Sequence, residues 1–354
     1  MGRIAPAGFQ RFVQALPGTV EFTFGGGEAN VAVSLALLGS QTAFVSALPA
    51  NPIADACAMQ LRGLGVETAH LLRTSYGRLG LYYLESGANQ RASNVVYDRD
   101  ESALMLTPAT AYPWTEIFQD AGWLHITGIT PALSANTAAA TLNAVTAAQH
   151  AGMTVSCDLN FRKKLWNWRP EMHPRSLAEA TMREILPFVD VLIANEEDAE
   201  QVLGIRAAET DIEAGALNVA EYVAVARQIV AQFPNLTRVA ITLRESISAT
   251  HNNWGGMLYD AVTGHAHYAP LSTAGDYAPY EIRAIVDRVG GGDAFAAGLI
   301  FALTTPELAA PDTAIHVAAA ASCLKHAIPG DFNYATRAEV MALVGGLASG
   351  RVNR

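Results

Sequence analysis

The feature of this sequence that most constrains its fold is an alternation between short β-branched runs and longer stretches rich in Ala and Leu. The short runs predict strands at residues 42–48, 123–127, 154–158, 189–194 and 238–243. The longer stretches predict helices, each ended by a glycine, at residues 28–38, 52–62 and 134–151. Strands that alternate with helices form a mostly parallel sheet with helices on both faces. The chain is therefore predicted to have an α/β fold.

A second region has a different pattern. Residues 79–85 and 93–98 are strand-like, and between them lies Ser86-Gly87-Ala88-Asn89, which favours a turn. Together with residues 18–24, this hairpin predicts a small accessory sheet. There is no internal repeat and no Pro/Ser-rich linker, so a single domain over residues 1–354 is predicted. The charged stretch at residues 206–213 is interpreted as a solvated surface loop.

Composition and charge exclude several classes of function. No apolar run reaches the roughly 18 residues that span a bilayer, and residues 1–16 do not resemble a signal peptide, so a cytoplasmic protein without a membrane partner is predicted. A net charge of −10 without a basic stripe argues against nucleic acid as a partner. An anionic substrate would therefore need a few locally placed cations. The three distant cysteines, Cys57, Cys157 and Cys323, are interpreted as reduced core thiols.

The strongest functional signal is a glycine-rich segment in the last third of the chain. A β-branched run predicts a strand at residues 282–286, the segment Asp287-Arg288-Val289-Gly290-Gly291-Gly292-Asp293 follows it, and residues 294–303 have a helical composition. The predicted order is strand, glycine loop, helix. Glycines at a helix start let the backbone approach a ligand, and the free N–H groups and the helix dipole attract phosphate. Asp293, in the first turn, could take a proton from an attacking hydroxyl. The alternative is a flexible turn with Asp293 as a helix cap.

An earlier segment, Gly25-Gly26-Gly27-Glu28-Ala29-Asn30, is a second glycine-rich entry into a helix. A dinucleotide-binding fingerprint would need a further glycine where this chain has Asn30, and a strong preceding strand. Asn30 instead offers a hydrogen-bonding amide. Dinucleotide binding is therefore disfavoured.

Together the two segments resemble the signature regions of the PfkB (ribokinase-like) family of carbohydrate kinases, an early GG-containing stretch with a following Asn and a late D-x-x-G-x-G-D. Within the family, the chain is most similar to kinases of 2-keto-3-deoxygluconate, through residues 6–12, 126–133, 158–166 and 330–331. The resemblance implies a ribokinase-like αβα sandwich with a small β-sheet lid at about residues 4–24 and 78–100. Members of this family often dimerise through their lid sheets, so the resemblance is compatible with a homodimer through the lid, and the sequence leaves the oligomeric state open.

The same resemblance implies that ATP, with Mg²⁺, phosphorylates the terminal hydroxyl of a sugar acid, converting 2-keto-3-deoxygluconate to its 6-phosphate. Asp293 would be the catalytic base, and the amides of Gly290, Gly291 and Gly292 would form the anion hole. The sugar-acid pocket would contain Gly26, Asn30, Tyr82, Tyr97, Arg99, Arg162 and Asp331. The nucleotide side would contain Asn195, Thr242 and Arg244, with Asp198 and Glu197 near Mg²⁺.

The arginines of this set favour an acid sugar, because a guanidinium can bind a carboxylate through two hydrogen bonds. A surface ion pair for Arg162, simple packing for the two tyrosines and a surface position for Arg244 are the alternatives. A sister kinase for fructose, ribose or a nucleoside is a further alternative. So is a non-catalytic sugar or nucleotide sensor on the same fold.

Three features depart from the family pattern. Asp198 is one methylene shorter than the usual Glu, and Glu197 is the residue expected to compensate. Arg288 stands where many relatives carry Thr. The sequence begins at about the point where the first strand of the family should have ended, which predicts an open sheet edge or slot and an earlier natural start.

Overall fold

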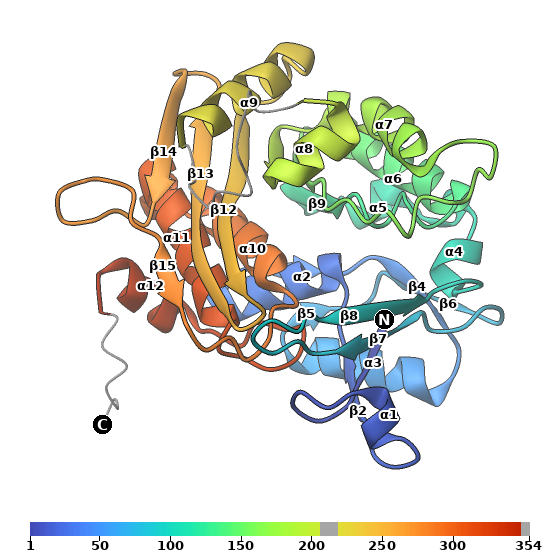
Figure 1. Ribbon diagram of the computed structural model, residues 1–354. Coiled ribbons are helices and arrows are strands. Elements are labelled where there is room, and N and C mark those ends of the chain that lie inside the picture. Colours follow the sequence, from blue (N-terminus) through green and yellow to red (C-terminus); the bar gives the residue numbers. More distant parts are fainter. Residues whose placement is uncertain (206–218, 348–354) are drawn as a thin grey trace.

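The computed structural model describes residues 1–205 and 219–347, so the loop predicted at residues 206–213 lies outside the described residues. Its centre is a seven-stranded sheet in the order β14-β13-β12-β11-β10-β9, with β15 also paired to β13 (Figure 1). The parallel strands are β9 (Trp123–Thr127), β10 (Thr154–Asp158), β11 (Val191–Ala194) and β12 (Arg238–Ser248). The antiparallel strands are β13 (His251–Asp260), β14 (His265–Ala269) and β15 (Tyr280–Ile282).

Helices cover both faces of this sheet (Figure 1). One layer contains α6 (Ala135–His150), α7 (Pro174–Ile185), α8 (Glu196–Leu203) and α9 (Val219–Gln232). The other contains α2 (Gly27–Leu38), α10 (Gly291–Thr304), α11 (Pro311–Lys325) and α12 (Arg337–Val344). In β11, Leu192 packs in the first layer and Val191 and Ile193 pack in the second. This burial on both faces explains the continuous apolar run and confirms the predicted αβα sandwich.

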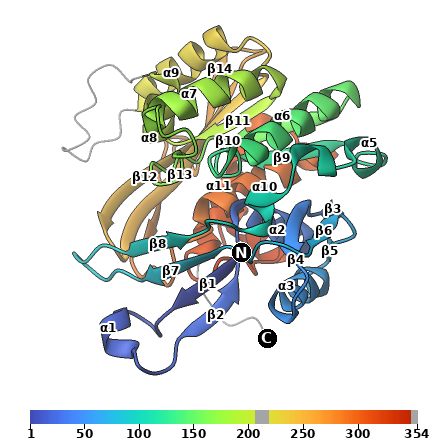
Figure 2. The same cartoon turned by 90° about the vertical axis from the view of Figure 1, so that its right-hand side faces the viewer.

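A separate four-stranded sheet, called the lid below, has the order β2-β1-β7-β8 (Figure 2). Its strands are β1 (Gly2–Ala5), β2 (Glu21–Phe24), β7 (Leu81–Glu85) and β8 (Asn94–Asp98). Side chains alternate between its faces, so that Tyr82 and Leu84 are buried. On the other face, Phe22 is 44% and Val96 is 52% exposed. The lid therefore has an inner face toward the body and a partly apolar outer face.

The other elements are short or peripheral. Two small parallel sheets pair β3 (Thr42–Ala43) with β5 (Val66–Glu67), and β4 (Ser46–Pro49) with β6 (Leu71–Thr74). The remaining α-helices are α1 (Phe12–Ala15), α3 (Pro52–Gly63), α4 (Ala103–Leu106) and α5 (Trp114–Ile117). Among the described strands, β9 is the last strand at one end of the seven-stranded sheet. None of the described helices is both long and apolar enough to span a membrane.

Two predicted strands are wrong in their extent. The strand predicted at residues 42–48 is divided into β3 and β4, because the first part pairs with β5 and the second part pairs with β6. The strand predicted at residues 282–286 is only the end of β15. Its later N–H groups bond to two different loops, Ile285 to the Thr250 carbonyl and Val286 to the His326 carbonyl. Because these two acceptors lie in different loops, no single neighbouring strand pairs with residues 285–286, and the strand ends at Ile282.

Candidate active site

A cavity of about 350 Å³ lies between the inner face of the lid and the carboxyl ends of β10, β11 and β12. In open α/β sheets, ligands bind at the carboxyl ends of the strands. Every predicted site residue except Glu197 lines this cavity. Glu197 is exposed on α8 and lies outside the cavity lining, so its position does not favour a compensating role for it. The cavity thus gathers side chains from both ends of the sequence.

The two glycine-rich segments meet at Asp293. The amide Nδ2 of Asn30 donates to the Oδ2 of Asp293 at 2.6 Å, although the two residues are 263 positions apart. The Oδ1 of Asn30 accepts the N–H of Gly26 at 3.1 Å. Asn30 therefore orients the carboxylate through Oδ2 and does not bond the other oxygen, Oδ1. Gly290, not Asp293, is the N-cap of α10, which does not support the helix-cap alternative.

Burial raises the pKa of Asp293 to about 6, while the hydrogen bond from Asn30 and the charge of Arg162 oppose this rise. A carboxylate of this kind is a stronger base than an exposed one and is still ionised at neutral pH. General bases work best when their pKa lies near the operating pH. The environment of Asp293 therefore suits it to accept a proton from a bound hydroxyl.

The glycine loop is held in a conformation that other residues would not adopt. Gly290 has a φ of 84°, and a Cβ at this position would lie 2.2 Å from the backbone oxygen of Asp331. Gly291 and Gly292 follow as the first residues of α10, where N–H groups have no acceptor within the helix, and the N–H of Gly291 makes only a long bond, of 3.4 Å, to the carbonyl of Arg288 in the loop. A Cβ at Gly292 would meet nothing within 4 Å. The loop thus presents backbone donors to the cavity, as an anion site requires.

Several arginines line the cavity without an ion pair to a carboxylate in the described part of the chain, and two of them, Arg99 and Arg162, are predicted sugar-acid contacts. The guanidinium of Arg99 lies 4.8 Å from the ring centre of Tyr97, and its Nε is buried with no hydrogen-bond partner. Burial lowers the pKa of Arg99. Arg162 is exposed and donates to the carbonyl of Phe161 at 2.9 Å. Because a buried cationic group without a partner is costly, Arg99 is suited to bind an anionic ligand, and Arg162 offers a second, exposed guanidinium to the same cavity.

Two of the predicted sugar contacts are bound to each other. The hydroxyl of Tyr82 donates to the Oδ1 of Asp331, and this oxygen also accepts from Arg3 at 3.2 Å. Burial, and then the charge of Asp331, raise the pKa of Tyr82. The second oxygen of Asp331 lies against Gly25, where a Cβ would be 2.0 Å away. The first glycine of the early segment is thus required by packing.

The nucleotide side of the cavity contains Asn195, Thr242 and Arg244. Asn195 caps α8 by accepting the N–H of Asp198 at 2.7 Å, and Asp198 accepts the N–H of Phe161 at 2.9 Å. Burial raises the pKa of Asp198 to about 6. Within residues 1–205 and 219–347, no three acidic, His or Cys side chains form a metal-binding group. The single carboxylate of Asp198 on this side of the cavity fits Mg²⁺, which is commonly bound by one or two carboxylates, waters and substrate phosphates.

Sequence reasoning missed several residues that the fold brings to the site. Asp287 was visible in the late motif and Asp158 in the segment 158–166, but neither received a role. Arg288 donates to the carbonyl of Ala249 at 2.8 Å and to the Oδ1 of Asn252 at 2.6 Å, so it ties the turn between β12 and β13 to the glycine loop. Arg3 lies in a short strand without any motif, and its sequence context gives no signal.

Known proteins with similar sequences and structures are carbohydrate kinases. Residues 5–243 match the model of the pfkB family carbohydrate kinases. The chain is 32% identical to a 2-dehydro-3-deoxygalactonokinase of Haloferax volcanii, over 98% of this chain and 94% of the relative. The crystal structure of a 2-dehydro-3-deoxygluconokinase from Thermotoga maritima has a TM-score of 0.87 and 41% identity, and covers 98% and 97% of the two chains. A pfkB family carbohydrate kinase from Listeria grayi has a TM-score of 0.84 and 31% identity, at 98% and 97% coverage. The chain belongs to the pfkB family of carbohydrate kinases.

Proposed function

We propose that the protein transfers the γ-phosphoryl group of ATP to the terminal hydroxyl of 2-keto-3-deoxygluconate, forming the 6-phosphate. The observation that carries this proposal is the pair Arg99 and Arg162, which faces the cavity of Asp293 without a carboxylate partner in the described chain. A charge-assisted hydrogen bond to a carboxylate contributes about 1.5–3 kcal/mol, which an uncharged hexose cannot supply. One of the relatives above is named as a kinase of 2-dehydro-3-deoxygalactonate and the other of 2-dehydro-3-deoxygluconate, which supports a 3-deoxy sugar acid as the substrate.

In the proposed reaction, Asp293 accepts the proton of the terminal hydroxyl as that oxygen attacks the γ-phosphorus, and ADP leaves on the opposite side. The N–H groups at Gly290, Gly291 and Gly292 stabilise the charge on the transferring group. Mg²⁺, held near Asp198 through water, would supply further neutralisation of the phosphates. Catalysis then consists mainly of positioning and charge stabilisation.

The nucleotide is proposed to bind at the ends of β11 and β12, opposite the lid. Asn195 follows β11, and Thr242 and Arg244 belong to β12, and all three line the cavity. The sugar acid would then lie on the lid side, between Arg99 and Arg162. This arrangement places the two substrates on either side of the glycine loop, as a direct transfer requires.

The experiment that tests this function is a substrate panel with coupled detection of ADP. It contains 2-keto-3-deoxygluconate, its galactonate epimer, fructose, ribose and a nucleoside. We expect the highest kcat/KM for 2-keto-3-deoxygluconate, and values at least about 100-fold lower for the uncharged sugars, since two charge-assisted contacts are lost. Equal turnover of fructose would indicate a sister kinase. No ADP release with any sugar would indicate a non-catalytic sensor.

The replacement Arg162→Ala should raise the KM for the sugar acid about 10- to 100-fold, because one charge-assisted contact is lost. The effect on kcat should be smaller, since the contact exists before and during the transfer. Steady-state kinetics with saturating ATP measure both values. Arg169→Ala is the matched control, because Arg169 is exposed and stacks on Trp168 outside the cavity lining. An unchanged KM in Arg162→Ala would exclude this residue as a carboxylate ligand.

We also propose a homodimer that forms through the outer face of the lid. Val96 and Phe22 are large apolar residues on this face, with exposed fractions of 52% and 44%. Exposed apolar patches of this kind often mark contact surfaces. Sedimentation velocity should show a dimer for the wild type and a monomer for Val96→Lys. A monomeric wild type at micromolar concentration would contradict the proposal.

A cytoplasmic location is part of the proposed function, because the reaction consumes ATP. The three cysteines are free in the structure, and two of them, Cys57 and Cys157, are buried. Unpaired thiols are typical of reducing compartments. Burial also raises the pKa of all three thiols, which makes them poor nucleophiles.

A further inference from the structure

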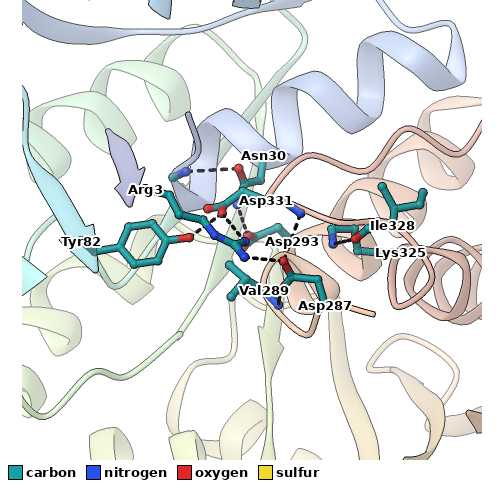
Figure 3. A network of polar contacts seen from close by, with 11 residues as sticks. Arg3, Asn30, Tyr82, Asp287, Val289, Asp293, Lys325, Ile328 and Asp331 are labelled. Atoms are coloured by element: carbon teal, nitrogen blue, oxygen red, sulfur yellow. Dashed lines mark hydrogen bonds and ion pairs between the residues drawn. The ribbon is translucent and has the colours of Figure 1, made fainter. Parts of the chain in front are cut away.

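Three charged side chains form a buried network beside the glycine loop, Arg3, Asp287 and Asp331, and the buried side chain of Lys325 lies near them (Figure 3). The Nη2 of Arg3 lies 2.6 Å from the Oδ2 of Asp287, and its Nη1 lies 3.2 Å from the Oδ1 of Asp331. The exposed fractions of these three side chains are 8%, 5% and 2%. Burial alone would lower the pKa of Arg3, but the two carboxylates outweigh this effect and raise it. Arg3 is therefore a permanent cation between two anions.

One of these anions holds the glycine loop. The Oδ1 of Asp287 accepts the N–H of Val289 at 3.0 Å, and its Oδ2 accepts the N–H of Gly330 at 3.0 Å. Val289 directly precedes Gly290, and Gly330 directly precedes Asp331. The Asp287 carboxylate thus joins the start of the anion loop to the segment that packs against it.

The second anion belongs to that packing segment. The backbone oxygen of Asp331 lies so close to Gly290 that a Cβ there would be 2.2 Å away, and the same Cβ would be 3.2 Å from the Cε of Lys325. The ammonium of Lys325 donates to the carbonyl of Ile328 at 2.9 Å. Asp331 therefore packs directly against Gly290, and a shift of its backbone toward the loop would displace the loop. The loop is therefore supported by residues that Arg3 directly binds.

Arg3 and its partners belong to different parts of the fold. It lies on β1 of the lid, whereas Asp287, Lys325 and Asp331 belong to the body of the protein (Figure 3). Tyr82, on the neighbouring lid strand β7, adds a second lid contact through its hydroxyl to Asp331. The network is thus also a connection between the lid and the loop that would bind the transferred phosphoryl group.

We propose that Arg3 is a positioning residue that couples the closed position of the lid, in contact with the body, to the geometry of the glycine loop. This inference rests on the proposed function, because it assigns the coupling to phosphoryl transfer. Arg3 touches neither Asp293 nor the nucleotide-side residues in the described contacts. Its loss should therefore lower the rate of transfer and leave nucleotide binding nearly unchanged. The sugar acid, bound under the lid, would stabilise the lid in contact with the body, and Arg3 would thereby order the loop.

The kinetic test compares Arg3→Met and Arg3→Lys with the wild type. Arg3→Met should lower kcat about 30- to 100-fold, since small displacements of a catalytic group reduce rates to this extent. The KM for ATP should stay within about threefold of the wild type. Arg3→Lys should recover part of the loss, because an ammonium can bind one carboxylate but cannot bridge two. Arg73→Met, which breaks the exposed pair with Asp55 away from the cavity, is the control and should keep full activity.

Removing Arg3 leaves two buried carboxylates without the cation that pairs with them, which can unfold a protein. Arg3→Lys keeps the charge, and the double variant Arg3→Met with Asp287→Asn removes one charge of each sign. If the network positions the loop, this double variant should lose less than the product of the two single losses. A kcat of Arg3→Lys within threefold of the wild type, together with full additivity in the double variant, would overturn the proposal.

Hydrogen exchange gives a readout that does not depend on catalysis. Without any substrate, Arg3→Lys should exchange faster than the wild type both in β1 and at residues 289–293, and not in β11 or α6. Faster exchange in β1 alone would show that Arg3 only anchors the lid and would contradict the coupling. This comparison stands even if the wild type phosphorylates no sugar acid, so the failure of the proposed function and the failure of this inference give different results.

Discussion

Asp293→Asn should nearly abolish phosphorylation of the sugar acid, with a fall in kcat of about 10³-fold or more, at the upper end of losses for a general base. Asn has the same shape, and its carbonyl can still accept the bond from Asn30. It cannot accept the proton of the attacking hydroxyl. Coupled ADP detection measures kcat, and calorimetry with ADP should show binding within threefold of the wild type. A variant that retains near-normal turnover would exclude Asp293 as the base.

The pH profile separates loss of the base from loss of structure. Because the pKa of Asp293 is raised to about 6, wild-type kcat/KM should fall below this pH as the carboxylate becomes protonated. The residual activity of Asp293→Asn should lack this limb. The raised pKa means that the folded state holds the proton more tightly than the unfolded state, so ionisation destabilises the fold as the pH rises through 6. Asp293→Asn should therefore be at least as stable as the wild type at pH 7.5.

Gly290→Ala should lower kcat about 10²- to 10³-fold, comparable to the loss of one donor in an oxyanion site. The new Cβ would lie 2.2 Å from the backbone oxygen of Asp331, and the φ of 84° is unfavourable for Ala. The loop must therefore move, and its N–H groups with it. Thermal unfolding and coupled ADP detection measure the two effects separately.

Gly264→Ala is the matched control for this change. Gly264 has a φ of 74°, close to that of Gly290, but a Cβ there would meet nothing within 4 Å. It lies between β13 and β14, outside the cavity lining. This variant should lose about 1–2 kcal/mol of stability from backbone strain and keep full activity. If Gly290→Ala behaves in the same way, the glycine loop is not the anion site.

The strongest sequence signals were those that local chemistry produces. The parallel strands were predictable because burial on both faces demands continuous apolar runs, as in β11. The late glycine segment was predictable because a helix N-terminus with free N–H groups binds anions wherever it lies in a fold. Predictions were wrong for features that depend on distant segments, such as the extent of the strand at residues 282–286. There the destination of each N–H group depends on loops that the segment itself does not encode.

By themselves, the residues of this chain determined the α/β architecture, the glycine loop and the identity of its adjacent carboxylate, since periodicity and composition act over a few neighbouring positions. Only the folded molecule decided that Asn30 would hold Asp293 across 263 positions, and that Arg3 would reach two carboxylates of the body from a lid strand. A charge can be buried only where opposite charges meet it. Which charges meet is set by the packing of distant segments, and no local pattern records that packing.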